Sequence, residues 1–267
     1  MRTSWGVAVG ACAAAPQQET RTGAERYHMA EPPRNLGAPL VARPPRCLHS
    51  PLPCGETTLA PDQAHHLGRV LRLSPGDPVE LVDGQGGWAQ ATWLGQGRVS
   101  VSEPAPRAPT PPVRVLAVAP PRPSRLEWLA EKAAELGVSR LALLSCEHAA
   151  RDVPPKRLTR LRRKASEALL QCRRLHLMQV QPPSSLQQVL RAWGPRPVWL
   201  AAPPPGSGRP PPPPHGELLI LVGPEGGFSA DEQALARRHG AHELALGSGV
   251  LRVETAALAM AVLAGPT

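Results

Sequence analysis

Residues 221–229 read LVGPEGGFS, an apolar run that breaks into a proline and three glycines. Residues 246–256 read LGSGVLRVETA and repeat the same organisation. Each stretch ends an apolar run and precedes a helical pattern, so each is expected to be a turn at the end of a strand. Because glycine has no Cβ, a ligand can approach its main chain closely. Two such turns close together predict a ligand held by backbone groups.

The region around these turns alternates strand and helix patterns from Val113 onward. Strands are expected at residues 113–119, 140–144, 197–202, 218–222 and 243–246, and helices at 124–136, 156–174, 229–240 and 253–263. Ser124 with Glu127, and Ser229 with Glu232, have the spacing of capping boxes that open two of these helices. The alternation predicts an α/β fold with a mostly parallel sheet covered on both faces, in which ligands lie beyond the carboxyl ends of the strands.

Residues 44–105 have a different pattern, which predicts a small β domain. A short helix is expected at 62–73, and strands at 79–82, 88–94 and 99–101 are separated by the hairpin turns DGQGG and QG. A linker with five prolines follows at 103–112. The domain organisation is therefore an extension at 1–43, a β domain at 44–105 and an α/β domain at 113–267. The extension is expected to be a flexible tail or sequence upstream of a start at Met29, and the proline-rich stretch 203–214 a surface loop.

Composition narrows the classes of partner. The net charge of +9 favours a polyanion such as nucleic acid, although a bias toward arginine gives the same charge without a ligand. The five cysteines form no CxxC pair, and Cys47 and Cys54 lack zinc spacing to His49, so we expect neither a metal site nor a disulfide framework. No apolar run reaches the ~20 residues of a membrane helix. A cytoplasmic protein without membrane or metal partners is expected.

Known nucleotide motifs do not account for the two glycine turns. The turn at 223–227 lacks the GK[ST] ending of a P-loop and is not GxGxxG. Instead, LVGPEGGFS with Glu232, and Leu246-Gly247 followed by LRVETA, resemble the 16S ribosomal RNA (uracil-N3)-methyltransferase family (RsmE-like) of the SPOUT superfamily. EKAAELGV at 131–138 and the basic helix around Glu167 resemble further signatures of that family, and residues 65–84 resemble its PUA-like domain. The resemblance spans residues 44–264.

The resemblance implies an N-terminal PUA-like β-barrel, a C-terminal SPOUT domain with a trefoil knot, and a homodimer. It also implies that S-adenosyl-L-methionine binds in the knotted loops at 200–202, 221–227 and 246–251. The residues implied to bind the cofactor are Leu200, Ala201, Leu221, Gly223, Glu225, Gly226, Gly227, Leu246, Gly247, Ser248, Gly249 and Leu251. The chain departs from the family where Gly249 and His148 replace arginines and Met178 replaces a proline.

Candidate catalytic residues follow the second turn: Arg252, Glu254 and Thr255. Methyl transfer to uracil N3 requires stabilised negative charge on O2 and O4, which the permanently charged Arg252 can supply. The alternative is that Arg252 only orders the loop through a salt bridge to Glu254 or Glu225. Thr255 is expected to cap the last helix and to touch cofactor or base. No residue is an obvious general base, since a histidine such as His66 in a β domain is more often structural.

The helix expected at 156–174 is the strongest RNA-binding candidate because seven basic side chains cluster between Arg157 and Arg174. Its phosphate contacts would give salt-dependent affinity, whereas an ordinary solvated face is the alternative reading. The predicted RNA-binding residues of this helix and of the β domain are Arg69, Arg72, Arg157, Arg160, Arg163, Lys164 and Arg174, with Arg162 and Arg173 in the same cluster.

The function expected from residues and resemblance together is methylation of N3 of a uridine in 16S ribosomal RNA, recognised in an assembled small subunit. Two alternatives remain open at this point. One is a SPOUT enzyme that acts on another RNA nucleotide. The other is a non-enzymatic RNA-binding or ribosome-assembly factor.

Overall fold

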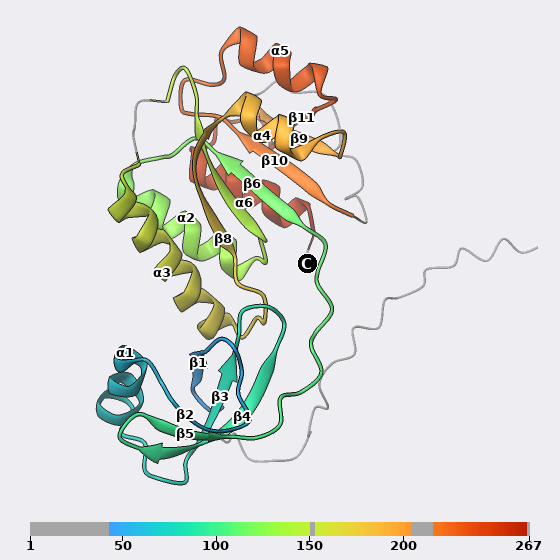
Figure 1. Ribbon diagram of the computed structural model, residues 1–267. Helices are drawn as coiled ribbons and strands as arrows, with labels where there is room; N and C mark the ends of the chain where they lie inside the picture. Colours follow the sequence, from blue (N-terminus) through green and yellow to red (C-terminus); the bar gives the residue numbers. More distant parts are fainter. Residues whose placement is uncertain (1–42, 150–152, 204–215, 266–267) are drawn as a thin grey trace, which may run out of the picture. The chain divides into compact units, whose positions relative to one another are not determined.

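The computed structural model describes residues 43–149, 153–203 and 216–265, which belong to one compact unit (Figure 1). The expected extension, up to residue 42, and the proline-rich loop at 204–214 lie outside the described residues. The described chain contains two separate sheets, one on each side of residue 110.

The first sheet has five strands in the order β1-β3-β4-β5-β2. Strands β1 and β3 pair in parallel, and the other neighbours are antiparallel. Its elements are β1 (Arg46–Leu48), β2 (Gly55–Thr58), α1 (Pro61–His65), the π-helix η1 (His66–Val70), β3 (Pro78–Val82), β4 (Trp88–Gly95) and β5 (Arg98–Val101). The sequence pattern missed β1 and β2, because three- and four-residue strands are too short to show a period.

Both predicted hairpin turns are confirmed. The Asp83 carboxylate accepts hydrogen bonds from the amides of Gln85 at 2.7 Å and Gly87 at 2.9 Å, which closes the turn between β3 and β4. Gln96 and Gly97 both have positive φ, as the two-residue turn between β4 and β5 requires.

The second sheet has six strands, all parallel, in the order β11-β9-β10-β6-β7-β8. Its strands are β6 (Arg114–Val118), β7 (Arg140–Ser145), β8 (Gln179–Ser185), β9 (Val198–Ala202), β10 (Leu218–Val222) and β11 (His242–Ala245). The expected parallel α/β architecture is thereby confirmed. The strand β8 was not predicted, since its sequence QVQPPSS contains two prolines and little apolar patterning.

Helices cover both faces of this sheet (Figure 1). They are α2 (Pro123–Glu135), α3 (Pro155–Cys172), α4 (Leu186–Trp193), α5 (Ala230–Arg238) and α6 (Val253–Leu263). Alternate strand residues enter different cores: Leu116 and Val118 pack with α2, α3 and α6, whereas Val115 and Ala117 pack with α4. The helix α4 was also missed by the sequence pattern.

Three helix starts had been expected to be capped by a side chain, and one of them is. Ser229 and Glu232 form the predicted capping box at the start of α5, with both hydrogen bonds present. The capping box predicted for Ser124 and Glu127 is wrong, because α2 begins earlier, at Pro123, and Arg122 is its N-cap. Thr255 does not cap α6 either: Arg252 occupies the N-cap position and Thr255 lies inside the first turn. Proline at the first helical position can start α2 without a side-chain cap, since its missing N–H needs no partner.

Ionic and backbone contacts join the first sheet to the end of α3. Glu80 Oε2 accepts hydrogen bonds from Arg46 Nε and from an Arg173 guanidinium nitrogen, each at 2.6 Å. The turn at 83–87 also bonds the segment after α3: the Gly86 amide donates to Leu175 O at 2.9 Å, and the Leu177 amide donates to Gly84 O at 2.8 Å. The small β domain is thus attached to α3 by main chain as well as by side chains.

Candidate functional site

The carboxyl ends of three neighbouring strands bring the predicted cofactor segments together. β9 lies between β10 and β11, with Leu200 opposite Leu221 and Ala201 opposite Leu244. Because all three strands are parallel, the segment after β10 and the segment after β11 emerge at the same edge of the sheet. The two glycine segments, at Gly223 and at Gly247, therefore lie at one edge of the sheet.

The turn after β10 is built around Phe228. A Cβ on Gly223 would lie 2.9 Å from Phe228 Cδ2 and 3.2 Å from the Phe228 amide nitrogen, so only glycine fits there. Gly227 has a positive φ of 75°, and its amide donates to Pro224 O at 2.8 Å. Glu225 and Gly226 are exposed at the tip of this turn. The turn is tightly packed at its base and exposed at its tip.

The segment after β7 supports this turn from the side. His148 Nδ1 lies 3.1 Å from Gly227 O, and the Glu147 amide donates to Glu232 Oε1 at 3.0 Å. Glu232 therefore serves two elements, since its other oxygen accepts from the Ser229 amide at the start of α5. The sequence predicted the capping role of Glu232 and showed that His148 replaces an arginine of the family. It gave no indication that the two residues lie at the same turn.

The segment after β11 is open to solvent. Gly247, Ser248, Gly249 and Leu251 are exposed, and Gly247 has a φ of 127° that other residues rarely adopt. A Cβ on Gly247 or Gly249 would meet no atom within 4 Å. The main chain of this segment can therefore be reached by a ligand, which fits a cofactor recognised by backbone amides and carbonyls.

The three catalytic candidates differ in their surroundings. Arg252 is exposed, and among the described residues its side chain forms no hydrogen bond or ion pair. Glu254 is 4% exposed and pairs with Arg125 of α2 at 3.6 Å, so the alternative in which Arg252 is tied to Glu254 is not what the structure shows. Thr255 is exposed in the first turn of α6. Arg125 was missed by sequence reasoning because only the packing of α2 on α6 brings it to Glu254.

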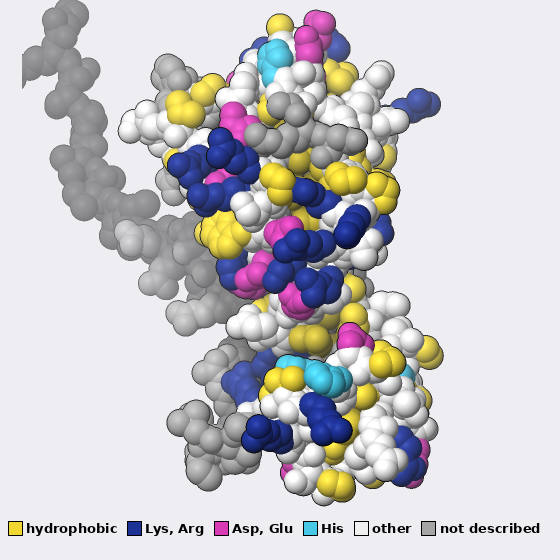
Figure 2. Space-filling model, turned by 90° about the vertical axis from the view of Figure 1, so that its left-hand side faces the viewer, with side chains coloured by type: hydrophobic (Ala, Val, Ile, Leu, Met, Phe, Trp, Pro, Cys, Tyr) yellow, Lys and Arg dark blue, Asp and Glu magenta, His cyan; other side chains and the backbone are white. Residues whose placement is uncertain are grey.

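Half of the basic side chains of α3 are paired with glutamates. Arg160 binds Glu127 of α2 at 2.9 Å, and Arg163 binds Glu167 at 3.5 Å. Lys164 pairs with Glu167 at 3.0 Å and with Glu131 at 3.7 Å. Figure 2 shows this face, on which Lys and Arg side chains are interleaved with Asp and Glu side chains.

The basic residues at the two ends of α3 differ in their contacts. Near the start of the helix, Lys156 and Arg157 form no ion pair with any described residue. At the other end, Arg173 binds Glu80, and Arg174 Nε donates to Glu135 O at 3.0 Å. Arg174, predicted to bind RNA, thus lies half-buried at the junction of α2, α3 and the first sheet. The free cationic surface of α3 is concentrated near its N-terminus.

The predicted RNA-binding residues of the first domain remain accessible. Arg69 and Arg72 are exposed at the end of η1, next to the exposed apolar side chains Val70 and Leu71. His66 is exposed on the same short helix and lies in the first domain, away from the strand ends that form the candidate site.

Other site chemistries find no support in the described residues. No group of three or more His, Cys, Asp or Glu side chains among them is placed to hold a metal ion. No described helix is both long enough and apolar enough to span a bilayer. Burial raises the pKa of the Cys146 thiol, just before His148, to about 12, so this sulfur is protonated at neutral pH and is not a nucleophile.

Two parts of the chain match known protein families. Residues 109–264 match a family described as an RNA methyltransferase domain, and residues 59–92 match an RNA methyltransferase PUA domain. The chain belongs to the RsmE-type RNA methyltransferase family. The ribosomal RNA small subunit methyltransferase E of Synechocystis sp. (strain ATCC 27184 / PCC 6803 / Kazusa) is 32% identical over 209 residues, which cover 74% of this chain and 69% of that relative.

Two solved methyltransferase structures share the fold. The ribosomal RNA small subunit methyltransferase E of Neisseria gonorrhoeae, bound to S-adenosyl methionine, superposes with a TM-score of 0.74 at 25% identity, covering 82% of this chain and 95% of its own. A methyltransferase of Legionella pneumophila in complex with the cofactor SAM gives a TM-score of 0.70 at 26% identity, with the same coverage. The family membership expected from the two glycine turns is confirmed.

Proposed function

We propose that this RsmE-type enzyme transfers a methyl group from S-adenosyl-L-methionine to N3 of a uridine in 16S ribosomal RNA. The observation that carries the proposal is the meeting of the two glycine segments, after β10 and after β11, at one sheet edge with exposed main chain. The names of its relatives, small subunit methyltransferase E, and the cofactor bound to its structural neighbours support the same reaction.

The residues present fit S-adenosyl-L-methionine. The open main chain at Gly247 and Gly249 offers amides and carbonyls without side-chain obstruction, and the exposed tip at Glu225 faces the same edge. We assign cofactor contacts to residues 200–201, 221–227 and 246–251. When bound, the cofactor supplies an electrophilic methyl group on a sulfonium sulfur.

The protein contributes alignment and charge. Methyl transfer from a sulfonium is an in-line displacement, so holding uracil N3 in position lowers the barrier. The exposed Arg252 guanidinium stabilises the negative charge that develops on uracil O2 and O4 as the N3 proton leaves to solvent. Glu254 is a positioning residue: its ion pair with Arg125 fixes the first turn of α6, from whose N-cap Arg252 projects. Thr255 lies on the exposed side of the same turn.

We further propose that α6 completes a trefoil knot and that the first sheet closes as a PUA-like barrel. The support for a knot is the path of α6, which packs against β10, β6 and β9 although it follows the edge strand β11. The support for a barrel is the mixed pairing of five strands around one apolar core.

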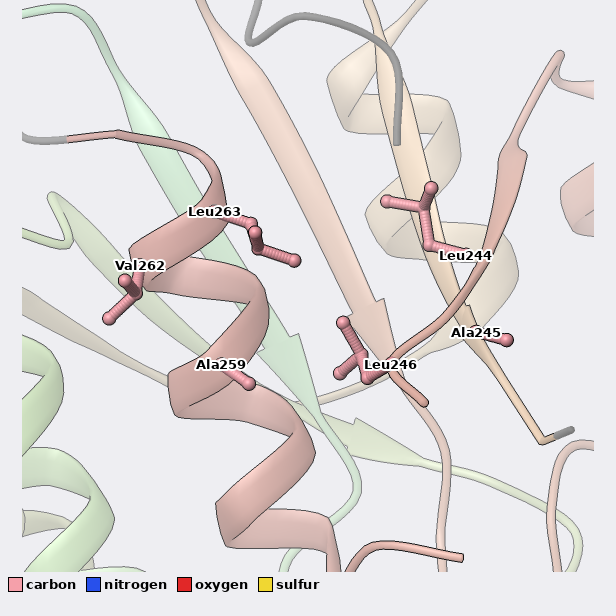
Figure 3. A pocket seen from close by; sticks show the side chains of 6 residues that line it. All are labelled: Leu244, Ala245, Leu246, Ala259, Val262 and Leu263. Atoms are coloured by element: carbon pink, nitrogen blue, oxygen red, sulfur yellow. The ribbon is translucent and has the colours of Figure 1, made fainter. Parts of the chain in front are cut away.

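We propose a homodimer because an apolar surface lies between β11 and the C-terminal end of α6. A cavity of about 500 Å³ is lined by Leu244, Ala245, Leu246, Ala259, Val262 and Leu263 (Figure 3). Val262 is 60% exposed and Leu263 is 38% exposed. Contiguous apolar surface of this kind is typical of a protein interface, and a second copy would cover it. Sedimentation of the full chain at the mass of a monomer would contradict this assignment.

For RNA, we propose that the exposed arginines Arg69 and Arg72 act with the N-terminal half of α3, in the cytoplasm, on the small subunit. Lys156 and Arg157 pair with no described acid, and at Arg160, Arg163 and Lys164 RNA phosphates would replace the glutamates.

The decisive experiment is methyl transfer from labelled S-adenosyl-L-methionine to small subunits that lack base methylation, followed by mass spectrometry of the nucleosides. Label recovered as 3-methyluridine is expected. Label in another nucleoside would move the enzyme to a different target. Cofactor binding without transfer to subunits or free RNA would overturn the substrate assignment.

A further inference from the structure

A tryptophan on α2 is left in water. Trp128 is 43% exposed, whereas Trp93, Trp193, Trp199 and Phe228 are buried and Trp88 is half-buried. It is therefore the most exposed aromatic side chain that the structure describes. The core contacts of α2 are made by its other apolar residues, Leu126, Leu129, Ala130, Ala133 and Ala134. Packing of the fold does not explain a large aromatic ring at this position.

Two basic residues share the face of α2 that carries the ring: Arg125 precedes Trp128 by three positions and Lys132 follows by four. Lys132 Nζ is paired with Glu131 at 2.9 Å and with Glu135 at 2.7 Å, so Arg125 is the more accessible cation. The Arg125 side chain is half exposed. A flat apolar ring beside a half-exposed guanidinium is suited to a single-stranded nucleic acid, because a base can stack on the ring while a neighbouring phosphate approaches the guanidinium.

Trp128 is connected to the proposed reaction site through Arg125 and Glu254. Arg125 holds Glu254 in the first turn of α6, and that helix begins directly after Arg252. Trp128 is one helical turn, about 5 Å, further along α2 than Arg125. A nucleotide next to the one at Arg252 can therefore reach the ring.

We propose that Trp128 is a stacking platform for a ribosomal RNA base that neighbours the target uridine. This inference rests on the proposed function, because it uses the same RNA and the same reaction edge. Stacking tolerates any base, so Trp128 fixes the position of the strand without selecting its sequence. It complements the phosphate contacts of α3, which attract and orient the RNA without reading its sequence.

The test compares Trp128→Leu with Trp128→Phe in the full chain, using small subunits without base methylation. The leucine variant keeps an apolar side chain and loses the ring, so its affinity should fall about 5- to 150-fold, as expected for loss of one stacked base. The phenylalanine variant should recover most of that loss. Affinity for S-adenosyl-L-methionine and the thermal unfolding midpoint should remain at the wild-type values in both variants, because the ring is outside the core.

Salt dependence separates stacking from phosphate contacts. Trp128→Leu should lower affinity by the same factor at every salt concentration, whereas Arg157→Gln should reduce the slope of log affinity against log salt. Wild-type affinity and kcat/KM in Trp128→Leu would overturn the proposal, as would equal losses in both Trp128 variants. If Trp128→Leu weakens a dimer and leaves RNA affinity unchanged, the ring contacts protein and the proposal is overturned. If the wild-type chain binds subunits but transfers no methyl group, the proposed reaction fails, and the affinity comparison still decides the role of Trp128.

Discussion

Arg252 and Glu254 are two positions apart, yet their environments are opposite. Arg252 is exposed at the N-cap of α6, while Glu254 is buried and paired with Arg125. A buried carboxylate needs a partner, because an unpaired charge in the interior is costly. Pairing Glu254 with α2 leaves the Arg252 guanidinium available for a ligand.

Replacing Arg252 with alanine should reduce kcat about 100- to 1,000-fold, the loss typical when one donor to a developing oxyanion is removed. Binding of S-adenosyl-L-methionine, measured by calorimetry, should be unchanged because the cofactor contacts are assigned to main chain. Arg125→Ala is the matched comparison, since it removes an arginine of the same region that is not placed at uracil O2 or O4. Full activity of Arg252→Ala would remove this side chain from the reaction.

At the scale of elements, the two glycine segments differ in packing. The turn after β10 packs against Phe228, whereas the segment after β11 has no neighbouring atoms at Gly247 and Gly249. Gly223→Ala places a methyl group against the buried Phe228 ring and should lower the free energy of unfolding by about 1–3 kcal/mol. Gly249→Ala is the control, because its Cβ would meet no atom within 4 Å, and it should change stability by less than about 0.5 kcal/mol. Urea unfolding of the two variants measures the difference. Equal effects would mean that Phe228 moves freely, and that the turn is not fixed by this contact.

The helix α3 carries a second prediction at this scale, on electrostatics. Arg157→Gln should reduce the salt slope of RNA affinity by about 0.7–0.9, the value for one lost phosphate contact. Arg160→Gln should reduce it less, because Glu127 already competes for that guanidinium at 2.9 Å. Filter binding of subunits between low and moderate salt gives both slopes. An RNA affinity that is indifferent to salt in the wild type would contradict the assignment of α3.

For the whole molecule, the junction between the first sheet and the segment after α3 includes a half-buried histidine. His176 lies in the segment that pairs with the turn at 83–87, and its Nε2 atom is buried without a partner. Burial lowers its pKa below the usual 6.5, although the nearby Asp83 carboxylate opposes the shift and is itself paired with Arg107 at 2.8 Å. The neutral imidazole is therefore the form that the junction accommodates.

Acid should loosen this junction. Below about pH 6.5 the unfolded chain takes up a proton at His176 that the folded chain binds only at lower pH, so the free energy of unfolding falls as the pH decreases through that window. In His176→Gln, which does not titrate, this part of the pH dependence should disappear. Urea unfolding midpoints between pH 8 and 5 compare the two proteins. Identical slopes would show that His176 does not carry the pH dependence.

The amino-acid sequence by itself determined the parallel α/β region, the two glycine turns and the family, because strand and helix periods and the turn glycines are local properties. Its failures were also local: the short β1 and β2, the proline-containing β8 and the cap of α2 leave weak or misleading patterns. Tertiary structure alone decided which side chains meet. It pairs Glu254 with Arg125 and places His148 against Gly227, although these residues are far apart in the chain. It also leaves Trp128 exposed on α2. Such contacts follow from how helices pack on the sheet, which the pattern of a single sequence does not encode.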